Sequence, residues 1–123
     1  MKYATLYDKF FSRFPYDAEE LKKKAEEASA EPSDGMHVMF GMVVVPFVME
    51  LLERGDERKL AVAFDFFEEM AEAENTMISE VLEFTILEDI ISRGKVILSQ
   101  CKRYMKHKTL ENCFTVEKYM TDS

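Results

Sequence analysis

The sequence predicts an all-α protein of about six to seven helices, stacked as antiparallel pairs in an irregular helical bundle. Two observations carry this prediction. Apolar residues recur at intervals of three and four along most of the chain, which is the spacing of one face of an α-helix. The single β-branched run, Val43 to Val45, lies inside a longer apolar segment with the same spacing, so its length favours a buried helix over a strand. The 123 residues suit one domain, and we expect a single helical domain over residues 1–123.

An N-terminal helical hairpin is expected in residues 1–30. Aromatic and aliphatic residues from Tyr3 to Phe14 repeat at three and four positions, which predicts an amphipathic helix over residues 2–14 that Pro15 ends. Residues 17–28 are rich in Glu, Lys and Ala with few apolar anchors, so they predict a second helix at the surface. Residues 31–35 form the clearest linker in the chain.

Core helix pairs are expected in residues 35–104. A third helix should begin after residue 33 or 34 and run to about Arg54, where Gly55 acts as its C-terminal cap. Pro46 lacks a backbone N–H and should kink this helix or split it in two. Asp56 and Asn75 or Thr76 are plausible N-caps of the next two helices. The remaining predicted helices cover residues 56–73, 75–91, 95–104 and, more weakly, 109–120.

The middle of the chain resembles a helix pair of the HEAT type. The resemblance rests on residues 45–56 (Val-Pro-Phe-Val-Met-Glu-Leu-Leu-Glu-Arg-Gly-Asp) and residues 60–71 (Leu-Ala-Val-Ala-Phe-Asp-Phe-Phe-Glu-Glu-Met-Ala). In that pattern a leucine-rich helix meets a tight turn containing Asp, and a second helix follows with small residues at its packing face. The resemblance implies a HEAT-like antiparallel pair, on which a further pair over residues 75–104 would stack.

Charge is distributed unevenly along the chain. The 16 basic and 24 acidic residues give a formal net charge of -8, which disfavours nucleic acid as a partner and favours a cationic one. No Lys or Arg occurs from Leu60 to Ser92, a segment that carries nine acidic residues. These nine are our predicted partner-binding residues: Asp65, Glu68, Glu69, Glu72, Glu74, Glu80, Glu83, Glu88 and Asp89.

Four of these carboxylates are predicted to form a stripe along the helix of residues 56–73. Asp65, Glu68, Glu69 and Glu72 follow the spacing i, i+3, i+4 and i+7, which places them on one face. Like charges at this spacing destabilise an isolated helix by roughly 0.2–0.5 kcal/mol per pair, and no Lys relieves them. We therefore interpret the stripe as an uncompensated candidate binding surface. The alternative is that the carboxylates serve only solubility.

No recognisable catalytic, cofactor or metal motif occurs in the sequence. Neither His37 nor His107 has the Glu three residues earlier that a di-metal site in a helical bundle requires. Phosphate-binding glycine loops and Cys-x-x-Cys pairs do not occur either. We therefore expect no catalytic residues, no enzyme activity, no cofactor and no metal. His37 is expected to be a satisfied core or edge residue, and the basic patch of residues 102–108 to pair with the acidic face, bind an anion or be solvated.

Several buried residues are expected outside the candidate surface. Cys101 and Cys113 are predicted to be small buried apolar residues of a reducing compartment. The methionines of the third helix, Met36, Met39, Met42 and Met49, are predicted to pack in the core. The apolar stretch of residues 35–49 is too short to span a membrane and is expected to be a core helix. Without a secretory signal pattern at residues 1–5, we expect a cytoplasmic protein.

Two functions fit this pattern. In size, charge and helical pattern the chain resembles the immunity proteins with which bacteria neutralise secreted antibacterial toxins, such as those of contact-dependent growth inhibition. This resemblance implies a cationic, nuclease-type toxin domain as partner, occluded by the acidic surface. The alternative is a HEAT-like adaptor or regulatory protein that docks a helix or peptide of a partner in a groove. Either would act as a monomer or weak dimer, without contact to nucleic acid or a membrane.

Overall fold

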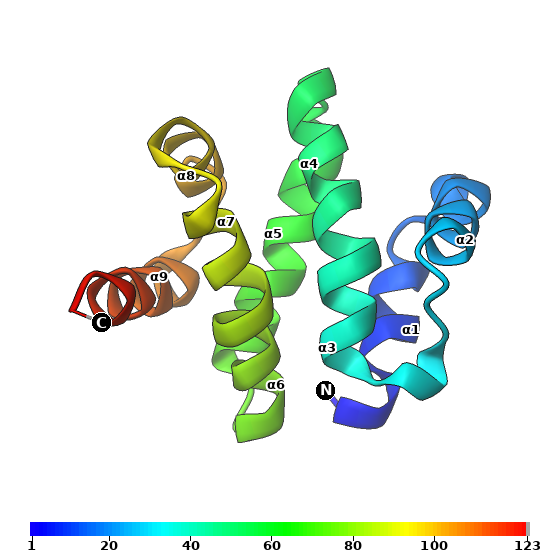
Figure 1. Ribbon diagram of the computed structural model, residues 1–123, viewed down its shortest axis with the longest axis horizontal. Coiled ribbons are helices and arrows are strands. Elements are labelled where there is room, and N and C mark those ends of the chain that lie inside the picture. Colours follow the sequence, from blue (N-terminus) through cyan, green and yellow to red (C-terminus); the bar gives the residue numbers. More distant parts are fainter. Residues whose placement is uncertain (123) are drawn as a thin grey trace.

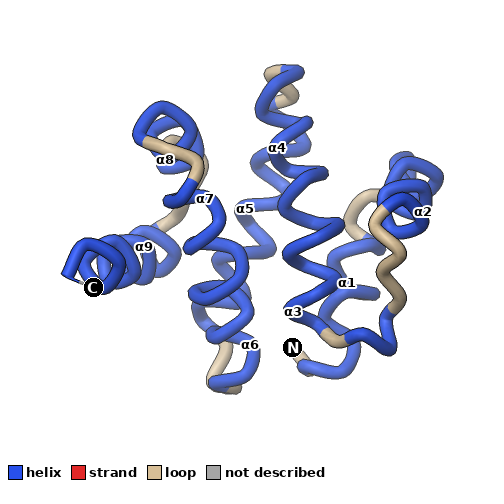
Figure 2. Tube along the Cα trace, in the orientation of Figure 1, coloured by secondary structure: helices blue, strands red, loops and turns tan. Residues whose placement is uncertain are grey.

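The computed structural model describes residues 1–122, and within them every regular element is helical (Figures 1 and 2). The all-α prediction is therefore confirmed. In chain order the elements are the 3-10 turn η1 (Tyr3–Thr5), α1 (Leu6–Ser12), the 3-10 turn η2 (Pro15–Asp17), α2 (Ala18–Glu27), the 3-10 turn η3 (Pro32–Asp34), α3 (Met36–Met39), the π-helical segment η4 (Phe40–Val44), α4 (Val45–Arg54), α5 (Glu57–Glu72), α6 (Thr76–Glu80), the π-helical segment η5 (Val81–Leu87), α7 (Glu88–Ser92), α8 (Lys95–Lys102) and α9 (His107–Asp122).

Local capping signals set the helix ends as the sequence predicted. Gly55 adopts a left-handed conformation with φ of 66° and ends α4, because a residue without Cβ takes this conformation at little cost. The side chain of Asp56 accepts a hydrogen bond of 3.2 Å from the backbone N–H of Lys59 at the start of α5. Asn75 accepts one of 2.9 Å from the N–H of Met77 at the start of α6. These caps confirm the predicted boundaries.

The expected split at Pro46 does not occur. α3, η4 and α4 form one continuous helix in the ribbon, and Pro46 lies in the first turn of α4, directly after the π-helical segment (Figures 1 and 2). In the π-helical segment upstream, backbone hydrogen bonds join residues five apart instead of four. This changes the hydrogen bonding in the turn where Pro46, which lacks an N–H and carries a bulky ring, would disturb a regular α-helix. The helix therefore changes its winding at this point instead of breaking.

The helices form two layers (Figure 1). The helix α3–η4–α4 and the helix α6–η5–α7 lie side by side in front, flanked by α2 and α9, while α1 and α5 lie behind them. α4 and α5 pack against each other as an antiparallel pair joined by the turn at Gly55 and Asp56, the arrangement that the HEAT-type resemblance implies. α9 contacts both η5 in the front layer and α5 in the rear layer, so α5 lies between α1 and α9.

Fully buried phenylalanines bring the two layers together. The ring of Phe10 on α1 contacts Phe40 and Phe47 from the front layer and Phe66 and Phe67 from α5, with the Phe10 and Phe66 ring centroids 5.3 Å apart. Burying such side chains contributes about 1.5–3 kcal/mol each. The same aromatic residues thus anchor the N-terminal hairpin and hold the front helices against α5.

The helix α3–η4–α4 is long and apolar enough, by length and composition, to cross a membrane. Most of its apolar residues lie in the core of the protein, as expected for a core helix. Those buried include Met36, Met39, Phe40, Val43, Val44, Val45, Phe47, Val48 and Leu51.

Candidate interaction surfaces

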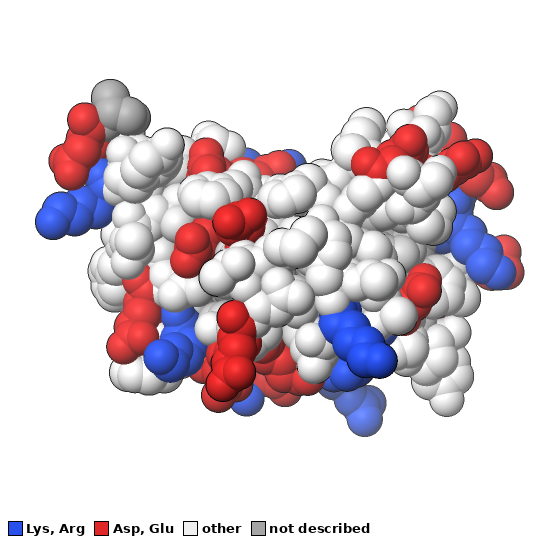
Figure 3. Space-filling model, turned by 90° about the horizontal axis from the view of Figure 1, so that it is seen from below, with Lys and Arg blue, Asp and Glu red and all other residues white. Residues whose placement is uncertain are grey.

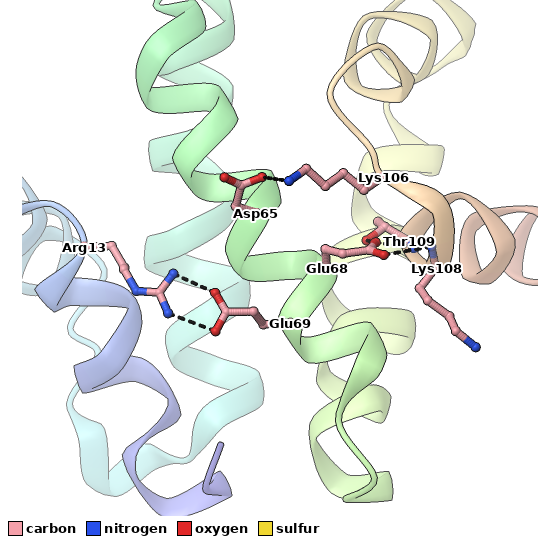
Figure 4. Close-up of polar contacts among 7 residues, drawn as sticks. All are labelled: Arg13, Asp65, Glu68, Glu69, Lys106, Lys108 and Thr109. Carbon is pink, nitrogen blue, oxygen red and sulfur yellow. Dashed lines mark hydrogen bonds and ion pairs between the residues drawn. The ribbon is translucent and has the colours of Figure 1, made fainter.

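The α5 stripe is composed of Asp65, Glu68, Glu69 and Glu72. Figure 4 shows its first three members on α5, between α1 and α9. As predicted, the four side chains lie on the polar side of one helix. Their surroundings differ from the expectation, because basic and polar groups from both ends of the chain approach the same side of α5. Each carboxylate must therefore be considered with its own neighbours.

Glu69 ties α5 to the end of α1. Its two carboxylate oxygens accept hydrogen bonds of 2.8 and 3.0 Å from the two terminal nitrogens of the Arg13 guanidinium (Figure 4). The guanidinium also lies over the ring of Phe66, 5.1 Å from its centroid. The hydrogen bond from Arg13 holds the pKa of Glu69 below its ordinary value although partial burial acts in the opposite sense. A two-pronged contact of this kind fixes orientation as well as distance.

Glu68 caps the first turn of α9 from a different helix. Its carboxylate accepts hydrogen bonds from the backbone N–H groups of Lys108 (3.0 Å) and Thr109 (2.9 Å) and from the Thr109 hydroxyl (2.8 Å) (Figure 4). Lys106, whose carbonyl accepts the first helical hydrogen bond, has no side-chain oxygen to cap the helix. Burial raises the pKa of Glu68, but these three hydrogen bonds outweigh it and lower the pKa below the ordinary value.

The outer members of the stripe are more exposed. Asp65 forms an ion pair of 2.6 Å with Lys106, and this contact raises the pKa of the lysine. Glu72 is exposed and has no ion pair within 4 Å among residues 1–122. The interpretation of the stripe as uncompensated is therefore wrong for three of its four members. Lys106 belongs to the basic patch of residues 102–108, and it pairs with the acidic face, which is one of the roles expected for that patch.

Of the other five predicted carboxylates, Glu74 lies beside the stripe, where it lines a shallow pocket with Glu69 and Glu72, and four lie away from it. Glu74 is exposed in the turn between α5 and α6, and the rest belong to the front helix α6–η5–α7. Asp89 forms an ion pair with Arg93 one turn later. Glu80, Glu83 and Glu88 have no ion pair within 4 Å among the described residues. The predicted set thus divides into a rear group, largely compensated, and a front group, largely not.

The front group lies on a hollowed face, which we name the concave face. It consists of the exposed sides of α3–η4–α4 and α6–η5–α7, between α2 and α9. η5 packs against α5 behind it and has η4 on one flank and α9 on the other. η4 packs against η5 on one flank and α2 on the other. The exposed sides of both segments therefore face forward. Figure 3 shows the upper edge hollowed between the α9 end and the α2 end, with the carboxylates in separate groups.

Apolar groups are exposed on this face. Met42 on η4 is 48% exposed and Phe84 on η5 is 52% exposed. Met42 was expected in the core with its neighbours; the helix instead turns it outward, while Met36 and Met39 are buried. Towards the diverging ends of α4 and α8 the surface deepens into a cleft of about 540 Å³. Its lining combines Pro46, Met49, Leu52 and Ile97 with the polar groups of Glu50, Glu53, Arg93 and Gln100.

The two π-helical segments meet at the centre of the concave face. The Nδ1 atom of His37 lies 2.5 Å from the Thr85 hydroxyl, a hydrogen bond that joins the two front helices. A Cβ atom at Gly41 would lie only 3.2 Å from the Thr85 methyl carbon, so glycine permits this close approach. His37 is thus an edge residue with a partner, as expected. Neither π-helical segment was predicted from the spacing of apolar residues, although π-helical turns often mark functional positions in proteins.

The described residues contain no cluster of three or more His, Cys, Asp or Glu side chains placed to hold a metal ion. Cys101 and Cys113 are buried, as predicted, and burial raises the pKa of Cys101 to about 12 and that of Cys113 to about 11. Both thiols therefore stay protonated and weakly nucleophilic at neutral pH.

Residues 7–120 match the model of a family described as a domain of unknown function, DUF7674. The chain belongs to this family. No curated protein and no solved structure matches it. The DUF7674 domain covers all the helices from α1 to α9, so both the α5 stripe and the concave face are features of the domain itself.

Replacing Glu68 by Ala should lower the free energy of unfolding by about 2 kcal/mol, because two amides of α9 and the hydroxyl of the buried Thr109 lose their acceptor. Urea denaturation followed by circular dichroism measures this change. The matched control is Glu74→Ala, which removes an exposed carboxylate with no ion pair within 4 Å among residues 1–122 and should stay within about 0.5 kcal/mol of the wild type. Equal losses in the two variants would contradict the capping role of Glu68.

Stability should also depend on pH through Glu68 and Glu69. Both have a lowered pKa in the folded state, so their contribution is present above the pKa of the unfolded chain and is lost as pH falls through the folded-state pKa. The melting temperature should therefore fall as pH drops below about 5. The double variant Glu68→Gln, Glu69→Gln should show a shallower fall in a series of thermal melts. Parallel curves for the two proteins would show that these carboxylates are not responsible.

Proposed function

We propose that this protein is a non-enzymatic binding protein that docks a cationic segment of a partner protein on its concave face, in the manner of a HEAT-like adaptor or regulatory protein. The observation that supports this most is the contrast between the two acidic groups. The rear carboxylates Glu68 and Glu69 are occupied by contacts within the chain, whereas Glu80, Glu83 and Glu88 in front have no cation within 4 Å among the described residues.

The apolar surface beside these carboxylates supports the same proposal. Exposed Phe84 lies one helical turn from both Glu80 and Glu88, so a partner that covers the ring also comes within reach of the two charges. Large aromatic side chains such as Phe84 supply much of the affinity at protein interfaces, and charges around them supply specificity and fast association. The proposal places the protein in the cytoplasm, where it would act without a cofactor.

A narrower form of the proposal is immunity against a cationic toxin domain. The net charge of -8 favours this form, because the field of the whole molecule would attract a basic toxin while the concave face occludes its functional surface. The toxin-binding surface is then the concave face rather than the α5 stripe.

Photo-crosslinking from position 84 tests the proposal. A photoreactive phenylalanine analogue in place of Phe84, in cells that naturally make the protein, should give one discrete crosslinked product. The analogue at position 72, exposed on the α5 stripe, is the matched control and should give none. The triple variant Glu80→Gln, Glu83→Gln, Glu88→Gln is named the concave-face variant. When these three substitutions are combined with the analogue at position 84, the amount of crosslinked product should fall several-fold. A product from position 72 alone, or none from position 84, would overturn the proposal.

Growth rescue tests the narrower form. Where a neighbouring gene encodes a toxin domain, co-expression with this protein should restore growth, and the concave-face variant should weaken the rescue. The charge-control variant Asp8→Asn, Glu72→Gln, Glu74→Gln removes the same number of negative charges from exposed positions on α1 and on α5 with its following turn, and should rescue fully. Reversing Glu68 or Glu69 would be a poor test, because each supports the fold. Equal rescue by both variants would count against toxin binding at this face.

A further inference from the structure

We infer that the group recognised by the concave face is an amphipathic α-helix of the partner, with apolar residues on one side and Lys or Arg along its borders. This inference rests on the proposed function and adds the secondary structure and chemistry of the bound segment. Three features carry it: the all-helical construction of the face, its exposed apolar groups and its unpaired carboxylates.

The construction of the face favours a helix over an extended segment. Both central elements, α3–η4–α4 and α6–η5–α7, use their backbone N–H and C=O groups within their own helices, and no strand edge exists among residues 1–122. An extended segment laid across Met42 and Phe84 would find no backbone partner there, so the amides that it turns towards the face would lose water without gaining a partner in the protein. A helix satisfies its backbone internally and presents only side chains to the groove.

The apolar groups are arranged to receive side chains from such a helix. Phe84 and Met42 are the chain neighbours of Thr85 and Gly41, where η5 and η4 approach closely, so the two exposed residues lie beside the contact between the two front helices. From there the surface leads along the same two helices towards the cleft between α4 and α8, whose apolar lining includes Met49 and Ile97. A helix lying along this path would place residues i, i+3 or i+4, and i+7 onto successive apolar positions.

The carboxylates around this path call for cationic residues. Glu53 at the cleft and Glu80, Glu83 and Glu88 along α6–η5–α7 have no ion pair within 4 Å among the described residues. Partial burial, with Glu80 as a further contribution, raises the pKa of Glu83, as expected for a carboxyl group without a counter-charge. Lys or Arg side chains on the borders of a bound helix would supply the missing positive charge.

Defined peptides test the inference with the full chain. The probe is a fluorescently labelled peptide of about 18 residues, with Leu at three- and four-residue intervals and Lys elsewhere, which forms an amphipathic helix. A second peptide of the same composition and charge carries D-amino acids at two central positions, so that it cannot form the helix. Fluorescence anisotropy at about 0.15 M salt should show binding of the first peptide, with the second at least tenfold weaker.

Two protein variants locate the binding. The concave-face variant should weaken binding of the helical peptide about tenfold, and Phe84→Ser should weaken it similarly, whereas the charge-control variant should change it less than about twofold. Equal affinity for the two peptides, equal weakening by the two charge variants, or no binding would overturn the inference. The proposed function fails separately, through the absence of a crosslink from position 84. If a partner is crosslinked from position 84 but the helical peptide does not bind, the inference of a cationic helix is rejected while the proposed function stands.

Discussion

The adjacent carboxylates Glu68 and Glu69 hold the two ends of the chain to the middle of the fold. Consecutive residues on an α-helix point about 100° apart, so two neighbouring side chains on α5 reach in different directions. Glu69 reaches Arg13 at the end of α1, and Glu68 reaches the first turn of α9 around Thr109. Apolar packing alone specifies position loosely, whereas these directional contacts fix how the outer helices are set against α5. The arrangement of the front layer, and hence the concave face, depends on this rear support.

Most helices of the fold were predictable because their signals are local. Gly55, Asp56 and Asn75 each act within a few residues of their own position, and the burial of Phe10 follows from the periodicity of its own helix. The partners of the α5 stripe were not predictable in this way. Arg13 lies 56 residues before Glu69, so no short-range pattern links them. One cue did exist: Lys106 stands where the last helix needs a capping oxygen, which indicates that another part of the chain must supply it.

The concave face was also hidden from the sequence, for a different reason. A π-helical turn adds one residue to the helical period, a change too small to detect in the spacing of apolar residues over five or seven positions. In the sequence Met42 and Phe84 resemble core residues, because each belongs to a strongly apolar run. The structure turns both outward at the place where Gly41 and Thr85 allow the two front helices to approach. The predicted acidic set included Glu80, Glu83 and Glu88 beside them, because their charge is evident from the sequence.

The cap that Glu68 provides also couples the stability of the last helix to that of α5. No side-chain oxygen at Lys106 caps α9, and the helix is 16 residues long, close to the length below which an isolated helix is marginal in water. The acceptor for the amides of its first turn is in place only where α5 is folded. Opening of α5 would therefore release α9 as well, so the two helices belong to one cooperative unit.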